Sequence, residues 1–248
     1  MPRFSLTARD LRLASGLVLL TYLSMHLLTH TTGLISLSLA EAALRFTMGI
    51  WQSLPGTVAL YGAFSLHLCL ALRTIYLRRH WRLPPIEWVR LWAGFSLPLL
   101  LIGHVVATRV AVARFGFQPS YTKVISGLIA GGAQGWQVAL LAPGWVHGCL
   151  GVWLSIRHNG LAQRLRPVLI AVLVAIPLLS AAGFIRMSLA VEAAGPVNIA
   201  HDPTRPPELK DWRHALRAAY VLLVIGAIVA GRARGDVTSS HEARRTER

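Results

Sequence analysis

The segment from Leu17 to Gly33, LVLLTYLSMHLLTHTTG, places the strongest constraint on what this chain can fold into. It is apolar enough to lie in lipid, yet it contains His26 and His30, which are one helical turn apart. An ionisable side chain in a membrane-spanning helix is costly, and by default it faces the interior of the helix bundle and has a function. Three later apolar runs each contain one further histidine: His67, His104 and His147.

The composition is that of a membrane protein. Hydrophobic residues make up 54% of the 248 residues and charged residues only 14%, whereas a soluble domain would have roughly a quarter charged residues. Runs of mostly apolar residues recur, each long enough to cross the ~30 Å hydrocarbon core of a bilayer. The alternating short strands of a membrane β-barrel are absent from the sequence. We therefore predict an all-α polytopic membrane protein.

Six membrane-spanning helices are predicted, the first four of which form a four-helix bundle. Their expected ranges are Leu11–Leu37, Pro55–Leu77, Trp88–Ala113, Trp136–Ile156, Pro167–Ala190 and Trp212–Gly231. Residues 1–231 then form one membrane domain. The segment Leu39–Trp51 has apolar residues at helical spacing and is expected to lie along the membrane surface. The proline-rich stretch Glu192–Asp211 is expected to lack regular structure. Residues 232–248 are expected to form a polar cytoplasmic tail that is either disordered or leads to a catalytic domain outside this sequence.

The net charge of +15 comes from Lys and Arg residues that cluster between the apolar runs and in the C-terminal tail. Cytoplasmic loops of membrane proteins are rich in these residues, so the pattern predicts that both termini are cytoplasmic and argues against nucleic-acid binding. The first span runs on through its histidines without a cleavage site and is interpreted as a retained helix. Cys69 and Cys149 lie inside apolar runs, so no disulfide is expected.

Depth along the helices groups four of the histidines into two pairs, the first of which is His26 with His104. His26 lies fourteen residues beyond Arg12, and His104 lies fourteen residues beyond Arg90. At about 1.5 Å per helical residue, both histidines are about 21 Å from the arginine-rich edge of the membrane. They can therefore share one plane across the bundle.

The second pair, His67 with His147, lies closer to the cytoplasmic edge. His67 is eleven residues before Arg78, and His147 is ten residues before Arg157, which places both about 15 to 17 Å from that edge. The iron of haem b takes one imidazole on each face of the porphyrin, and facing helices of a bundle can supply them. The pattern favours two haem b groups, one held by each histidine pair.

Two further residues are candidates for cofactor binding. His30 lies one turn beyond His26 on the same helix face, where it could contact a haem propionate or a quinone, or replace His26 as a ligand. Arg109, five residues after His104, could bind a propionate or simply extend its charge to the membrane surface. In a protein without haem, the buried histidines would form interhelical hydrogen bonds or the proton relay of a transporter.

The segments MHLLTHTTG, LHLCLAL, GHVVATRVAVARFG and VHGCLGVW resemble the four histidine helices of the dihaem cytochrome b subunits of succinate:quinone oxidoreductases and fumarate reductases. The resemblance covers the first five spans, and the order and spacing of the histidines carry it. It implies that the iron ligands are His26, His67, His104 and His147, with His30 outside the ligand set. It also implies an electron-transfer subunit that docks iron–sulfur and flavoprotein partners on its arginine-rich face.

The sequence also resembles, more closely, the six-span membrane region that precedes some bacterial class III adenylate cyclases. Five segments carry this likeness over most of Leu11–Ala190: HLLTHTTGLISL, PGTVALYG, RLPPIEW, GHVVATRV and WVHGCLG. It implies a redox sensor of the quinone pool in the bacterial inner membrane that signals to a cytoplasmic cyclase domain. A homodimer is a further expectation, since class III cyclases work as dimers. Residues 231–248 are too few for a cyclase domain, so we assign no catalytic residue and expect a truncated chain or a separate anchor.

Overall fold

The computed structural model describes residues 7–78, 80–197 and 208–246, with side chains placed up to residue 234. Within these residues every regular element is a helix. Six helical segments are long and apolar enough to cross a membrane: Ala8–Leu34, Leu54–Tyr76, Pro85–Phe115, Gln134–Ile156, Arg166–Ala194 and Leu209–Arg234. The predicted all-α polytopic fold is confirmed, and each predicted span overlaps one of these segments.

The first two spans begin at side-chain caps. Helix α1 (Ala8–Thr31) starts after Thr7, whose hydroxyl accepts a hydrogen bond from the Asp10 N–H while the Asp10 carboxylate accepts one from the Thr7 N–H. A 3-10 turn, η1 (Thr32–Leu34), ends this span. Helix α3 (Leu54–Tyr76) starts after Ser53, whose hydroxyl accepts from the Gly56 N–H.

The third and fourth spans contain interruptions in the helical geometry, whereas the fifth is one continuous helix. The third consists of α4 (Pro85–Val105), a π-helical turn η2 (Val106–Val110) and α5 (Ala111–Phe115). The fourth consists of α7 (Gln134–Ala139) and α8 (Leu141–Ile156), and the fifth is α10 (Arg166–Ala194). The π-helical turn η2 begins two residues after His104. Because such turns occur often at functional sites, it indicates that a functional site lies in this part of the bundle.

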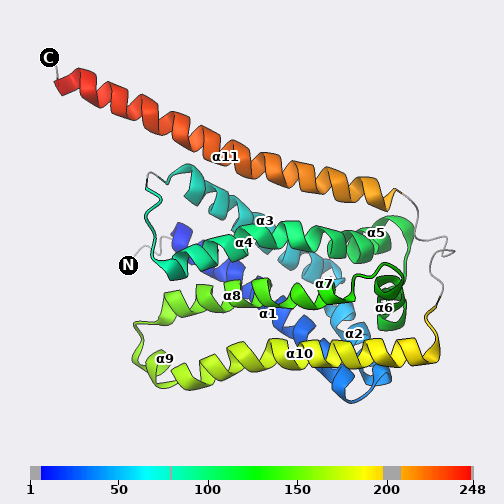
Figure 1. Cartoon of the computed structure of the whole chain (residues 1–248). Coiled ribbons are helices and arrows are strands. Elements are labelled where there is room, and N and C mark those ends of the chain that lie inside the picture. The colour runs from blue at the N-terminus through cyan, green and yellow to red at the C-terminus, as the bar shows by residue number, and fades with distance from the viewer. Residues whose placement is uncertain (1–6, 79, 198–207, 247–248) are drawn as a thin grey trace.

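Three shorter helices lie outside the spans: α2 (Leu37–Trp51), α6 (Tyr121–Ala130) and α9 (Gly160–Arg164). Helix α2 covers the helical segment expected from the sequence and packs against α1, α3 and α6. Helix α6 was not predicted. Figure 1 shows α2 and α6 at one end of the bundle, with the start of α1 and helix α9 at the other end.

The sixth span is part of α11 (Leu209–Thr246), a helix of 38 residues. Of the two alternatives expected for residues 232–248, a disordered tail is excluded as far as Thr246, where the chain is helical, and a tail that leads to a further domain stays a prediction. The tail contains no proline, and an established helix extends at one hydrogen bond per added residue. Figure 1 shows the C-terminal part of α11 projecting beyond the other helices. Half of the proline-rich stretch Glu192–Asp211 that was expected to be irregular, residues 198–207, lies outside the described residues.

Four helices form the central bundle: α1, α3, α4 and α8. Helix α1 packs against α3 and α8, and α8 packs against α4, so α1 lies diagonally opposite α4 and α3 lies diagonally opposite α8. Helix α10 packs on α1 and α8, while α11 lies across α3 and α4. The Tyr220 hydroxyl of α11 donates a hydrogen bond of 2.7 Å to the Phe95 carbonyl of α4.

Helices α1 and α10 cross at Gly183, where a Cβ would collide with the carbonyl oxygen of His30. We expect Gly183→Ala to push the helices apart and to lower the free energy of unfolding by about 1–3 kcal/mol. Unfolding of the purified protein in detergent measures this change. The control is Gly62→Ala, where an added Cβ would meet nothing within 4 Å. Equal stability of the two variants would contradict the close crossing.

Candidate functional site

The structure brings four of the predicted site histidines together in two pairs. The ring centroids of His26 on α1 and His104 on α4 are 5.8 Å apart, with the ring planes at 62°. Those of His67 on α3 and His147 on α8 are 6.1 Å apart, with the planes at 86°. Each pair therefore joins diagonally opposite helices of the central bundle. All four side chains are half-buried, so the packing around them is not closed.

In three of these histidines a hydrogen bond fixes the Nδ1 side of the ring. Nδ1 of His147 lies 2.9 Å from the Arg90 carbonyl oxygen. Nδ1 of His67 lies 3.2 Å from the Ser15 hydroxyl oxygen, and that hydroxyl donates to the Arg12 carbonyl. A histidine that donates through Nδ1 presents an unprotonated Nε2, which is the form that binds metal ions.

The third such histidine is His104, whose Nδ1 lies 3.2 Å from the side-chain amide nitrogen of Gln137 on α7. Because the two ends of a glutamine amide are nearly isosteric, Gln137 can offer either its nitrogen or its oxygen to this ring. Neither Gln137 nor Ser15 was among the site residues predicted from the sequence. For Gln137 a signal existed, since it is a polar residue next to the apolar run VALLAPGW.

Two glycines allow the rings of the His67/His147 pair to lie against neighbouring helices. A Cβ at Gly94 of α4 would lie 2.5 Å from Cε1 of His147. A Cβ at Gly16 of α1 would lie 3.2 Å from Cε1 of His67. The first distance is shorter than any real Cβ contact, so His147 occupies its position only because residue 94 has no side chain.

His30 lies outside both pairs and is almost completely buried, with 3% of its surface exposed. Its ring centroid is 4.7 Å from that of His26, 5.4 Å from that of Tyr121 and 5.7 Å from that of Phe184. Within residues 7–78, 80–197 and 208–234, neither ring nitrogen of His30 has a hydrogen-bond partner, and the buried Tyr121 hydroxyl has none either. Tyr121 belongs to α6, and no signal in the sequence connected that short helix with His30.

Arg109 lies in the π-helical turn η2 and connects the third span to the second. Its Nη2 donates a hydrogen bond of 2.9 Å to the Thr57 hydroxyl. Its guanidinium carbon lies 5.7 Å from the centre of the Tyr61 ring, a cation–π arrangement. The role of Arg109 in binding a propionate stays a prediction.

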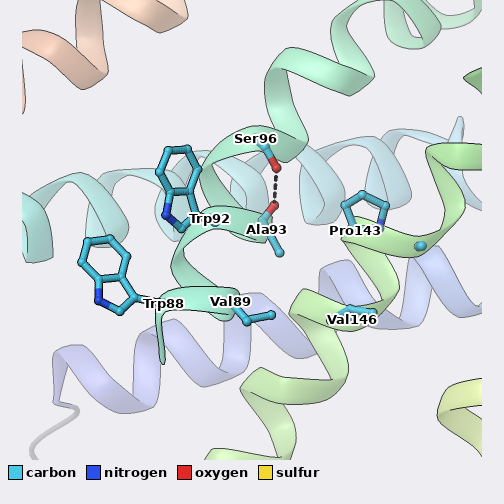
Figure 2. A pocket seen from close by; sticks show the side chains of 8 residues that line it. Trp88, Val89, Trp92, Ala93, Ser96, Pro143 and Val146 are labelled. Carbon is cyan, nitrogen blue, oxygen red and sulfur yellow. Dashed lines mark hydrogen bonds between the residues drawn. The ribbon is translucent and has the colours of Figure 1, made fainter. Parts of the chain in front are cut away.

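An open apolar depression of about 480 Å³ lies between α4 and α8 (Figure 2). Trp88 and Trp92 of α4 line one side, and Pro143 and Val146 of α8 line the other. The hydroxyl of Ser96, which also lines it, donates to the Ala93 carbonyl. No histidine is among its lining residues, so the depression is distinct from the two histidine pairs.

Comparison with family models, curated proteins and solved structures finds no match for this chain. Among the described residues, no group of three or more His, Cys, Asp or Glu side chains that could hold a metal ion occurs. The structure therefore defines the class of protein as an all-α multi-pass membrane protein with two interhelical histidine pairs.

Burial, and after it the nearby carboxylate of Glu41, raises the pKa of Tyr121 above its ordinary value. An unfolded chain ionises this phenol near pH 10, whereas the folded protein keeps it neutral. The contribution of Tyr121 to stability is thus complete below about pH 10 and is lost as the pH rises further. We expect Tyr121→Phe to reduce the alkaline loss of stability, measured as the unfolding midpoint in detergent against pH. The exposed Tyr61→Phe is the control, and equal slopes for both variants would contradict the burial of this hydroxyl.

Proposed function

We propose that the protein is a membrane anchor that binds two haem b groups, one between His26 and His104 and one between His67 and His147. The separation of the rings is the observation that carries this proposal. With iron–nitrogen bonds of about 2.0 Å and ring nitrogens about 1.1 Å from the ring centres, two imidazoles on one iron have centroids about 6 Å apart. The two pairs have centroids 5.8 and 6.1 Å apart.

The surroundings of the histidines support the same proposal. The hydrogen bonds to Nδ1 of His67 and His147 orient these two rings and leave their Nε2 atoms available. Gln137 leaves Nε2 of His104 available when its amide oxygen faces Nδ1 of that ring. Haem b supplies a one-electron carrier, since its iron can be ferric or ferrous. Helices of the bundle hold this carrier away from water. In this proposal Arg109 binds a propionate, and His30 offers its buried nitrogens to a propionate or to a quinone without binding iron.

We propose that helix α11 transmits the signal of a redox sensor. It packs against α3, which carries His67, and α4, which carries His104, so it contacts one helix of each pair. It also continues as a helix to Thr246, beyond the membrane-spanning part. We propose that the quinone pool sets the oxidation state of the haems, and that α11 passes the resulting change in packing to a cytoplasmic adenylate cyclase domain. Such coupling requires two packing states with different affinities for their ligands.

In this proposal the protein lies in the bacterial inner membrane with both termini in the cytoplasm, because the arginine-rich loops mark that side. Class III cyclases work as dimers, so the anchor is proposed to form a homodimer. Membrane lipid covers the exposed apolar faces of the helices.

A second candidate function is a cytochrome b electron-transfer subunit of a complex like succinate dehydrogenase or fumarate reductase. The exposed arginines Arg157, Arg164 and Arg166 favour it, since they offer a charged surface to a docking partner. Purification from native membranes distinguishes the two functions. An iron–sulfur protein and a flavoprotein would accompany the electron-transfer subunit, whereas cyclase activity would accompany the sensor.

Histidine replacement tests the two haem sites. We expect His67→Ala and His147→Ala each to lose one and the same haem, and His26→Ala and His104→Ala each to lose the other, because one axial imidazole is removed in each case. Haem content per chain and the number of steps in a redox titration measure the loss. The exposed His158→Ala is the control and should retain both haems.

His30→Ala decides the choice of ligand on α1. We expect it to keep two haems. If His30→Ala lost one haem while His26→Ala kept both, the ligand on α1 would be His30. A colourless wild-type protein would contradict both haem functions and support a transporter in which the histidines relay protons.

A further inference from the structure

Three arginines from three different helices lie near the His67/His147 pair: Arg12 on α1, Arg73 on α3 and Arg90 on α4. The positive charges of Arg90 and Arg73 are close enough to Arg12 to interact with it. Arg12 and Arg90 are half-buried, and Arg73 is exposed. The three side chains come from separate elements, so only the fold brings them together.

The backbone of two of these arginines holds the histidine pair in place. The Arg90 carbonyl accepts the hydrogen bond of His147 Nδ1, at 2.9 Å. The Ser15 hydroxyl lies 3.2 Å from His67 Nδ1 and donates to the Arg12 carbonyl at 3.1 Å. Arg73 follows His67 by six residues, or about 9 Å along α3. All three arginines are thus within a few helical turns of the ring pair.

Within the part of the chain that the structure describes, no carboxylate forms an ion pair with these three guanidinium groups, and none of them donates a hydrogen bond. Arg109, in contrast, has a hydrogen bond to Thr57 and a contact with the Tyr61 ring. Like charges gathered at a membrane-spanning bundle repel one another, and an anion placed between them removes that cost. The arrangement is therefore suited to a ligand with carboxylate groups.

We propose that Arg12, Arg73 and Arg90 bind the propionates of the haem held by His67 and His147. This inference rests on the proposed function. A haem has two propionates on one edge, and a guanidinium group matches a carboxylate with two parallel hydrogen bonds. The three positive charges exceed the two negative charges of the propionates. The excess charge favours the ferrous iron, which carries one positive charge fewer than the ferric iron.

The test uses Arg12→Gln, Arg73→Gln and Arg90→Gln in the full chain, purified with its haems. The readouts are haem content per chain and the midpoint potential of each haem, with His67→Ala and His26→Ala assigning the two steps. We expect a shift of the His67/His147 haem to more negative potential, or a fall from two haems to one, with the other haem unchanged. Arg12→Lys keeps the charge and should show a smaller shift than Arg12→Gln.

The matched control is Arg166→Gln, an exposed arginine at the start of α10, which should leave both potentials unchanged. If the three variants behave like this control, the arginines only set membrane orientation and the inference is wrong. A shift confined to the His26/His104 haem would also overturn it. Wild-type protein without haem would instead refute the proposed function. Arg73 is exposed, so Arg73→Gln gives a decisive result even if the half-buried variants fail to fold.

Discussion

The structure depends on how imidazole groups are accommodated inside a membrane-spanning bundle. A neutral imidazole has one donor and one acceptor nitrogen, and lipid offers a partner to neither. In His67, His104 and His147, one nitrogen is satisfied by a neighbouring hydroxyl, amide or carbonyl group. The rest of each ring faces the histidine of the diagonally opposite helix. This requirement explains the arrangement of α1, α3, α4 and α8, and the absence of a side chain at Gly94.

The ring nitrogens of His30 lack the hydrogen-bond partners that three of the paired histidines have among the described residues. Its two nitrogens and the Tyr121 hydroxyl are buried without a partner among the residues that the structure describes, and each unsatisfied group costs about 1–3 kcal/mol. Such a group calls for an explanation, and a redox or catalytic role is one of those known. The His30 ring contacts the rings of His26 on α1, Tyr121 on α6 and Phe184 on α10. These contacts place His30 next to the His26/His104 pair and support a function there.

The sequence was sufficient to predict the spans and which histidines lie side by side, because apolar length indicates a span and equal spacing from the arginines indicates equal height along the helices. The depth of each pair in the membrane stays a prediction. The fold class was confirmed, and the structure places His26 beside His104 and His67 beside His147. The helix α6 was missed, since a helix of ten residues is stabilised by tertiary packing and not by its own sequence. Ser15 and Gln137 were missed because hydrogen bonds between helices depend on how each helix is rotated.

The central claim is that an iron porphyrin lies between the two rings of each pair. The measurement that tests it most directly is an experimental density map of the protein purified from its native membrane. The account predicts flat density between His26 and His104 and again between His67 and His147, with an Nε2 atom directed at its centre from each side. Rings that contact each other or lipid with no density between them would contradict it.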